Sequence, residues 1–90
     1  MLTATESAKQ LLKEALIAHS DDPRVVLRLS FDSPGKFKII PDREVEGDQV
    51  IEHEDGKILV VASELAPMVE RVTLDVRDTT EGSKLVIRKE

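Results

Sequence analysis

Residues 49–62, QVIEHEDGKILVVA, contain the strongest folding signal in this sequence. Asp55-Gly56 is typical of a two-residue type I′ turn, and it separates two runs of strand-forming residues. We therefore expect a hairpin between residues 49–54 and 57–62. Its predicted cross-strand pairs are Glu54 with Lys57, His53 with Ile58, and Ile51 with Val60.

The second half of this hairpin is apolar on both faces, because Ile58, Leu59, Val60 and Val61 follow one another without interruption. A half-exposed strand would instead alternate apolar and polar side chains. Residues 58–61 are therefore predicted to form a central strand that is covered on both sides.

Upstream, apolar residues alternate with polar ones in two further segments, which predicts a second hairpin. Pairing Phe31 with Phe37 and Leu29 with Ile39 keeps the apolar side chains of both strands on one face. Pro41 is expected to end the second strand. This register leaves a five-residue loop of turn-forming composition: Asp32, Ser33, Pro34, Gly35 and Lys36.

The N-terminal residues have a helical period instead. Residues 3–19 are predicted to form an amphipathic helix, with Thr3 and Glu6 at the spacing of a capping box. The helix is expected to stop before Pro23, which disfavours helical geometry at the preceding residue. Its apolar stripe consists of Ala8, Leu11, Leu12, Ala15 and Leu16.

Downstream of the central strand, residues 63–69 resemble a short capped helical turn. Two more alternating strands follow, around residues 72–76 and 84–89, with the turn-rich residues 78–83 between them. The terminal strand Lys84–Lys89 could be an unprotected edge. The sequence thus predicts an α+β, mostly β fold, in which an N-terminal helix packs on a mixed or antiparallel β-sandwich or barrel-like sheet.

With 90 residues and 10.0 kDa, the chain is expected to form a single domain over residues 1–90. It contains no cysteine, which excludes thiolate metal sites, disulfides and thiol catalysis within these residues. No signal peptide and no apolar run of about 18 residues is visible, so we expect a cytoplasmic protein.

The formal charge of −5 comes from one acidic segment, residues 42–57. Cations supply most of the affinity for nucleic acids and anionic lipids, so neither is expected as a partner. The acids of the segment 42–57 are Asp42, Glu44, Glu46, Asp48, Glu52, Glu54 and Asp55.

Arg28 and Lys38 are expected on the outer face of their hairpin, paired with surface carboxylates.

The order of these elements resembles the HesB-like family, the A-type carriers of iron–sulfur cluster assembly. The resemblance covers nearly the whole chain. It is carried by residues 1–8 (MLTATESA), 47–51 (GDQVI), 55–60 (DGKILV), 63–68 (SELAPM), 72–76 (VTLDV) and 82–85 (GSKL).

The family places one cysteine in a loop after the first long strand and two more in a Cys-x-Cys-Gly tail. Residues 32–36 occupy the place of that loop without a cysteine, and the sequence ends at Arg88-Lys89-Glu90 without the tail motif. The resemblance therefore implies a cysteine-free member with no cofactor. Its expected role is that of an accessory or interaction module related to iron–sulfur cluster assembly, and self-association through the terminal strand is left open. Asp32–Lys36 would be a loop that contacts a protein partner, or else an ordinary hairpin connection.

A second hypothesis is a weak divalent-metal or small-ligand site in the acidic segment 42–55, using Glu52, His53 and Asp55. The alternative interpretation of His53 is a half-exposed strand histidine packed near Ile51 and Ile58.

A third hypothesis is a minimal enzyme, but no serine lies in a nucleophile-elbow motif and no catalytic residue is predicted. We therefore do not expect an enzyme.

Overall fold

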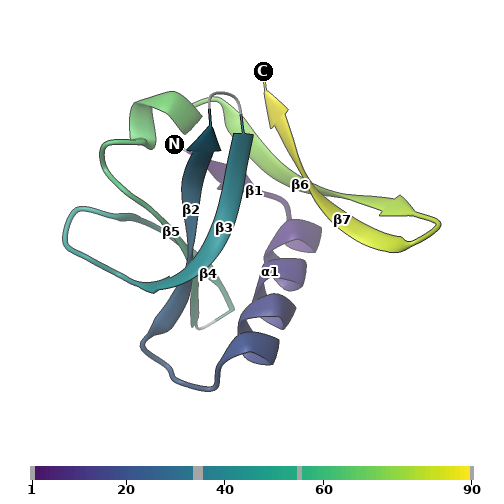
Figure 1. Cartoon of the computed structure of the whole chain (residues 1–90), viewed down its shortest axis with the longest axis horizontal. Helices are drawn as coiled ribbons and strands as arrows, with labels where there is room; N and C mark the ends of the chain where they lie inside the picture. The colour runs from purple at the N-terminus through teal and green to yellow at the C-terminus, as the bar shows by residue number, and fades with distance from the viewer. Residues whose placement is uncertain (1, 34–35, 55, 90) are drawn as a thin grey trace.

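The computed structural model of this chain describes residues 2–33, 36–54 and 56–89, and its strands form two mixed sheets beside one helix (Figure 1). This arrangement confirms the predicted α+β, mostly β fold with an N-terminal helix. The elements in chain order are β1 (Thr3–Ala4), α1 (Glu6–His19), β2 (Val25–Ser33), β3 (Lys36–Arg43), β4 (Gln49–His53), β5 (Gly56–Val61), η1 (Ala66–Val69), β6 (Val72–Thr79) and β7 (Gly82–Lys89).

The larger sheet has the order β3-β2-β5-β4, and the smaller one has the order β1-β6-β7. Each sheet contains one parallel pair, β2 with β5 and β1 with β6, while the remaining pairs are antiparallel. As a result, β3 and β4 are the edges of the larger sheet, and β1 and β7 are the edges of the smaller one.

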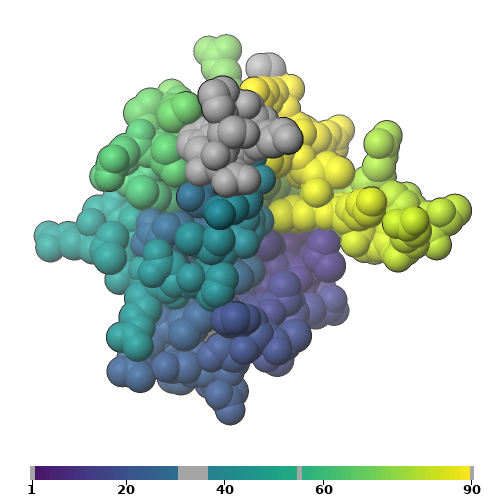
Figure 2. Space-filling view, in the orientation of Figure 1, coloured from purple at the N-terminus to yellow at the C-terminus, as the bar shows by residue number. Residues whose placement is uncertain are grey.

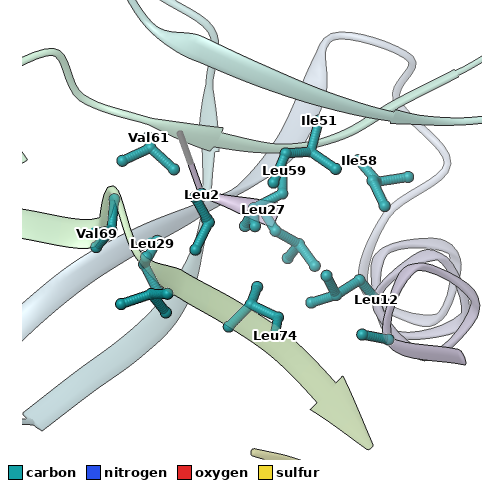
Figure 3. Close-up of a cluster of buried hydrophobic side chains, with 12 residues drawn as sticks. Leu2, Leu12, Leu27, Leu29, Ile51, Ile58, Leu59, Val61, Val69 and Leu74 are labelled. Carbon is teal, nitrogen blue, oxygen red and sulfur yellow. The ribbon is translucent and has the colours of Figure 1, made fainter. Parts of the chain in front are cut away.

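The hydrophobic core lies between the two sheets and α1 (Figure 3). β5 is central in its sheet, and all four of its apolar residues, 58–61, are buried, as predicted. Full burial of a side chain such as Leu59 contributes about 1.5–3 kcal/mol. Around β5 the core cluster gathers Leu2, Ala8, Leu12, Leu27, Leu29, Ile51, Val69, Val72 and Leu74.

The predicted start of the helix is wrong. α1 begins at Glu6, and its N-cap is Thr5, whose hydroxyl accepts a hydrogen bond from the amide of Ala8 at 3.2 Å. Thr3 instead belongs to β1, where it lies opposite Thr73 in parallel register. Because Thr3 lies in β1, it does not cap the helix, and its capping-box spacing to Glu6 has no role in this structure.

The register of the β2–β3 hairpin is confirmed, since Leu29 lies opposite Ile39 and Phe31 opposite Phe37. The strands run further than predicted at both ends. Ser33 pairs with Lys36, which shortens the five-residue loop, and β3 continues through Pro41 to Arg43. Proline has no amide hydrogen to donate to a neighbouring strand. It is tolerated here because β3 is an edge strand, with no further strand on its outer side.

The β4–β5 hairpin forms around the predicted turn, but its predicted register is wrong. His53 pairs with Gly56, Glu52 with Lys57, and Ile51 with Leu59, with an irregularity between Ile51 and Glu52. The extra residue of such a bulge shifts the pairing locally. Glu54 accordingly lies in the turn with a left-handed φ of 57°.

The last two strands extend beyond the predicted ranges, because Thr79 still pairs with Gly82 across the turn. All of residues 77–84 are exposed, so this end of the β6–β7 hairpin projects from the body (Figure 2). The predicted turn at residues 63–69 contains a 3-10 helix at Ala66–Val69, whose N-cap Leu65 makes no side-chain hydrogen bond. Among the described residues, no helix is long and apolar enough to cross a membrane.

Candidate functional site

An apolar slot opens between the two sheets, where the edge strands β3 and β7 approach each other. Its volume is about 270 Å³. Figure 2 shows β3 (teal) and β7 (yellow) side by side on this face. Phe37 and Ile39 of β3 and Leu85 and Ile87 of β7 are only partly buried. The slot is lined by Leu29, Phe37, Lys38, Ile39, Leu74, Leu85 and Ile87.

The sequence-predicted contact loop lies at the end of the hairpin that borders this slot. Asp32 and Ser33 end β2 and Lys36 begins β3, while Pro34 and Gly35 lie outside the described residues. Phe37, which lines the slot, follows directly after Lys36. The contact role of the loop therefore remains a prediction, and the candidate contact surface consists of the slot.

The face of the larger sheet opposite the core carries an ion-pair cluster centred on Arg28. Its Nη2 lies 2.7 Å from Oδ2 of Asp48, and its Nε lies 2.7 Å from Oδ2 of Asp42. Nη2 also donates to the carbonyl oxygen of Arg43 at 2.9 Å, and the amide of Val45 donates to Asp48 at 2.9 Å. The cluster fastens the segment between β3 and β4 onto the sheet.

Arg28 is paired with carboxylates, as expected, but its pair with Asp48 is buried and does not lie at the surface. The Asp48 side chain is 1% exposed and that of Arg28 is 13% exposed. The hydrogen bond from Arg28 lowers the pKa of Asp48, and the same bond raises the pKa of Arg28. The pKa of Asp42 is also lowered, chiefly by the backbone amide of Arg43 and then by Arg28.

Two further carboxylates of the acidic segment are engaged in ion pairs. Glu44 lies 2.6 Å from the amine of Lys57, and Glu54 lies 2.7 Å from that of Lys13. The Lys13 amine lowers the pKa of Glu54, and the Glu44 carboxylate raises the pKa of Lys57. Most of the described acids in residues 42–54 are therefore occupied within the chain.

Two residues of the hypothetical metal site, Glu52 and His53, are described, and they lie in different surroundings. Glu52 is exposed, whereas its neighbour His53 is buried toward α1, where its Nε2 lies 3.1 Å from Oε1 of Gln10. Glu6 and Glu54 lie 3.6 and 3.7 Å from the ring nitrogens. Asp55 lies outside the described residues. Within the described part of the chain, no three His, Asp or Glu side chains are grouped to hold a metal ion.

His53 is therefore more buried than predicted, with 8% of its surface exposed. It borders a polar cleft of about 560 Å³ along α1. A larger groove, of about 920 Å³, follows the C-terminal end of α1, and three of its rim cations, Lys13, Arg24 and Lys57, are paired with carboxylates.

The slot and the Arg28 cluster were both missed by reasoning from sequence. Alternation placed Phe37, Ile39, Leu85 and Ile87 on apolar faces, but it gave no sign that β3 and β7 would face each other across a gap. For Asp48, the available signal was a lone arginine in the middle of a predicted strand, which needs a counterion if its sheet face is covered.

Comparison with known proteins found a family model and a relative that cover nearly the whole chain. A family model described as iron–sulphur cluster biosynthesis matches residues 1–90. A protein of Azotobacter vinelandii, described as an uncharacterized protein in the nifU 5′ region, is 32% identical over 88 residues, which covers 92% of this chain and 80% of the relative.

Solved structures share the fold. SufA of Escherichia coli, described as involved in biosynthesis of iron–sulfur clusters, superposes with a TM-score of 0.71 at 20% identity, covering 98% of this chain and 84% of SufA. IscA, solved with a [2Fe-2S] cluster, gives 0.64 at 16% identity, covering 99% and 85%. A protein from Aquifex aeolicus gives 0.69 at 23% identity, covering 99% and 91%.

Proposed function

Because this chain belongs to the iron–sulphur cluster biosynthesis family, we propose that it is a non-enzymatic accessory module of that process, which contacts a protein partner and carries no cluster itself. The observation that carries this proposal is a family fold without a single cysteine in its 90 residues. The membership also confirms the resemblance to the HesB-like family.

The side chains present do not fit an iron–sulfur cluster. Such clusters are held by cysteine thiolates, with histidine replacing some of them in one class. This chain offers two histidines and no thiolate. His53 is buried with Gln10 3.1 Å from its Nε2, while His19 is the last residue of α1.

The slot between β3 and β7 supports a contact role. It exposes part of four apolar side chains, and Phe37 in its lining directly follows residues 32–36, which the resemblance matches to the family's ligand loop. Its lining is apolar except for Lys38, so it offers no pair of acid and base for catalysis. We therefore assign the slot a contact role and not a catalytic one.

Anaerobic reconstitution with ferrous iron and sulfide tests this proposal. We expect no visible absorbance to co-elute with this chain on gel filtration, while IscA, whose solved structure contains a [2Fe-2S] cluster, serves as the positive control. A stable cluster that co-elutes with this chain would overturn the proposal. Affinity capture from the native host should then recover proteins of iron–sulfur assembly, and recovery of none of them would count against the partner role.

A further inference from the structure

We propose that the partner supplies an extended acidic segment, which adds as a strand beside β7 and places apolar side chains into the slot. This inference rests on the proposed function, because it names the chemistry of the partner. β7 is hydrogen-bonded to β6 on one side only, so no described strand is hydrogen-bonded to its other edge. A free edge can accept an extended chain through main-chain hydrogen bonds, with specificity from alternate side chains.

The two faces of β7 specify what those alternate side chains should be. Leu85 and Ile87 lie opposite Val76 and Leu74 on the inner face, where they line the slot. An added strand would point every second side chain toward them. Its inward residues should therefore be aliphatic.

The outer face of β7 is basic. Lys84 and Arg88 lie on it at either side of Val86, and both are exposed. Arg88 is paired with Asp75, whereas Lys84 makes no ion pair among the described residues. The outward side chains of an added strand would lie beside these cations. Opposite charges on neighbouring strands are favourable, so the outward residues should be acidic.

The slot is small, with a volume of about 270 Å³. A slot of this size suits a few side chains of an extended segment, whose main chain stays at the sheet edge.

A second copy of this chain fits the edge less well. Antiparallel pairing of two β7 strands about Val86 would place Lys84 of each copy opposite Arg88 of the other, and such like-charge pairs are destabilising. Two acids of the acidic segment, Asp42 and Asp48, are already engaged in ion pairs with Arg28, so they would not be available to a second copy's β7. We therefore assign the edge to a different protein.

The test uses a short fluorescent peptide in which Ile and Glu alternate, and its counterpart with Lys in place of Glu. Fluorescence anisotropy should show saturable binding of the Glu peptide that weakens with salt, and little binding of the Lys peptide. Amide NMR shifts should concentrate on β7 and β3. Equal binding of both peptides, or shifts elsewhere, would overturn the inference.

Variants localise the binding. Lys84→Glu should weaken binding of the Glu peptide by about fivefold. Arg43→Glu, at the end of β3 away from the slot, should leave the affinity for this peptide unchanged. Ile87→Thr should weaken binding through the slot. If that variant unfolds, the comparison of Lys84→Glu with Arg43→Glu still tests the assignment of the β7 edge, because both positions are exposed and these variants should fold. Equal effects of these two reversals would contradict the assignment.

Two results separate this inference from the proposed function. Cluster formation in the reconstitution would overturn the proposed function whatever the peptide does. If no cluster forms and the peptide fails to bind, only the assignment of an acidic strand fails. Sedimentation that reveals a dimer, dissociated by Leu85→Asp, would assign the edge to a second copy instead.

Discussion

The guanidinium of Arg28 donates to both carboxylate oxygens of Asp48, from Nη1 to Oδ1 at 3.2 Å and from Nη2 to Oδ2 at 2.7 Å. Such two-point contacts fix geometry as well as charge. Because Asp48 also accepts from the amide of Val45, this pair holds a segment that no strand or helix contains.

Arg28→Ala should therefore destabilise the protein much more than an ordinary surface substitution. It leaves the buried Asp48 carboxylate without its cation, which we expect to cost about 2–3 kcal/mol. Urea unfolding followed by circular dichroism measures the loss. The matched control is Arg24→Ala, which breaks the exposed pair with Asp22 and should change stability little. Equal effects of the two variants would contradict a structural role for Arg28.

Stability should fall as the pH drops through and below the ordinary aspartate pKa of 3.8. The pKa values of Asp48 and Asp42 are lowered in the folded chain, so below this value the unfolded chain binds more protons than the folded one. The stabilisation is thus complete well above pH 3.8, and it is lost as the pH falls through the pKa values that Asp48 and Asp42 have in the folded chain. Urea midpoints at a series of acidic pH values measure this loss.

Asp48→Asn provides the control for this pH dependence. The variant is expected to be less stable at neutral pH, but it should lose less further stability on acidification, because one of the shifted carboxyls has been removed. A pH profile parallel to that of the native chain would show that other groups cause the acid sensitivity.

Thr5→Ala should destabilise α1 by about 1 kcal/mol, the usual value of an N-cap. Its hydroxyl accepts from the amide of Ala8 and donates to Asp75 at 3.0 Å, which joins the helix to β6. Thr3→Ala removes only an exposed hydroxyl contact with Thr73 and should cost less. Thermal unfolding distinguishes the two, and a larger effect at Thr3 would restore the capping box that the sequence suggested.

Leu59→Ala should cost about 2–5 kcal/mol, because the side chain is fully buried in the central strand. Ile17→Ala is the control, since Ile17 is 65% exposed on α1. Calorimetric melting of both variants gives the comparison. A small effect at Leu59 would mean that the core can collapse around the lost atoms.

Titration calorimetry should show no tight binding of calcium, manganese, zinc or iron. Glu52 and His53 point in different directions from β4, and His53 contacts Gln10. Tight binding that Glu52→Ala or His53→Ala abolishes would instead support the metal hypothesis. A signal that survives both substitutions would have to come from other residues.

Local periodicity predicted those parts of the fold that depend on neighbours in sequence. The register of β2 with β3 followed from keeping Leu29, Phe31, Phe37 and Ile39 on one face, and the structure has that register. The central position of β5 followed from its uninterrupted apolar run. A one-residue shift of the β2–β3 register, or an edge position for β5, would expose several aliphatic side chains. The pattern therefore leaves few alternatives.

The errors arose where distant segments meet. β1 contains two residues whose partners, Thr73 and Leu74, lie seventy positions away, so a helical extension looked equally good locally. The irregularity after Ile51 shifted the β4–β5 register without any glycine or proline to mark it. Asp48 was read as one acid among many, because its cation lies twenty positions upstream.

The candidate site was less accessible to such reasoning than the fold. The loop at residues 32–36 followed from register and turn composition, but its contact role was suggested only by its place in the family pattern. The slot requires knowing how two sheet edges approach each other. Hydrophobic alternation identifies which side chains avoid water. It does not tell which of them remain partly uncovered.

The projecting end of the β6–β7 hairpin has a practical consequence. Thr80 and Glu81 connect the strands far from the core, and Thr79 and Ser83 satisfy polar groups within the hairpin itself. Exposed tips of this kind usually tolerate inserted residues. A reporter sequence or a tether could therefore be built in at this point without disturbing the hydrophobic core.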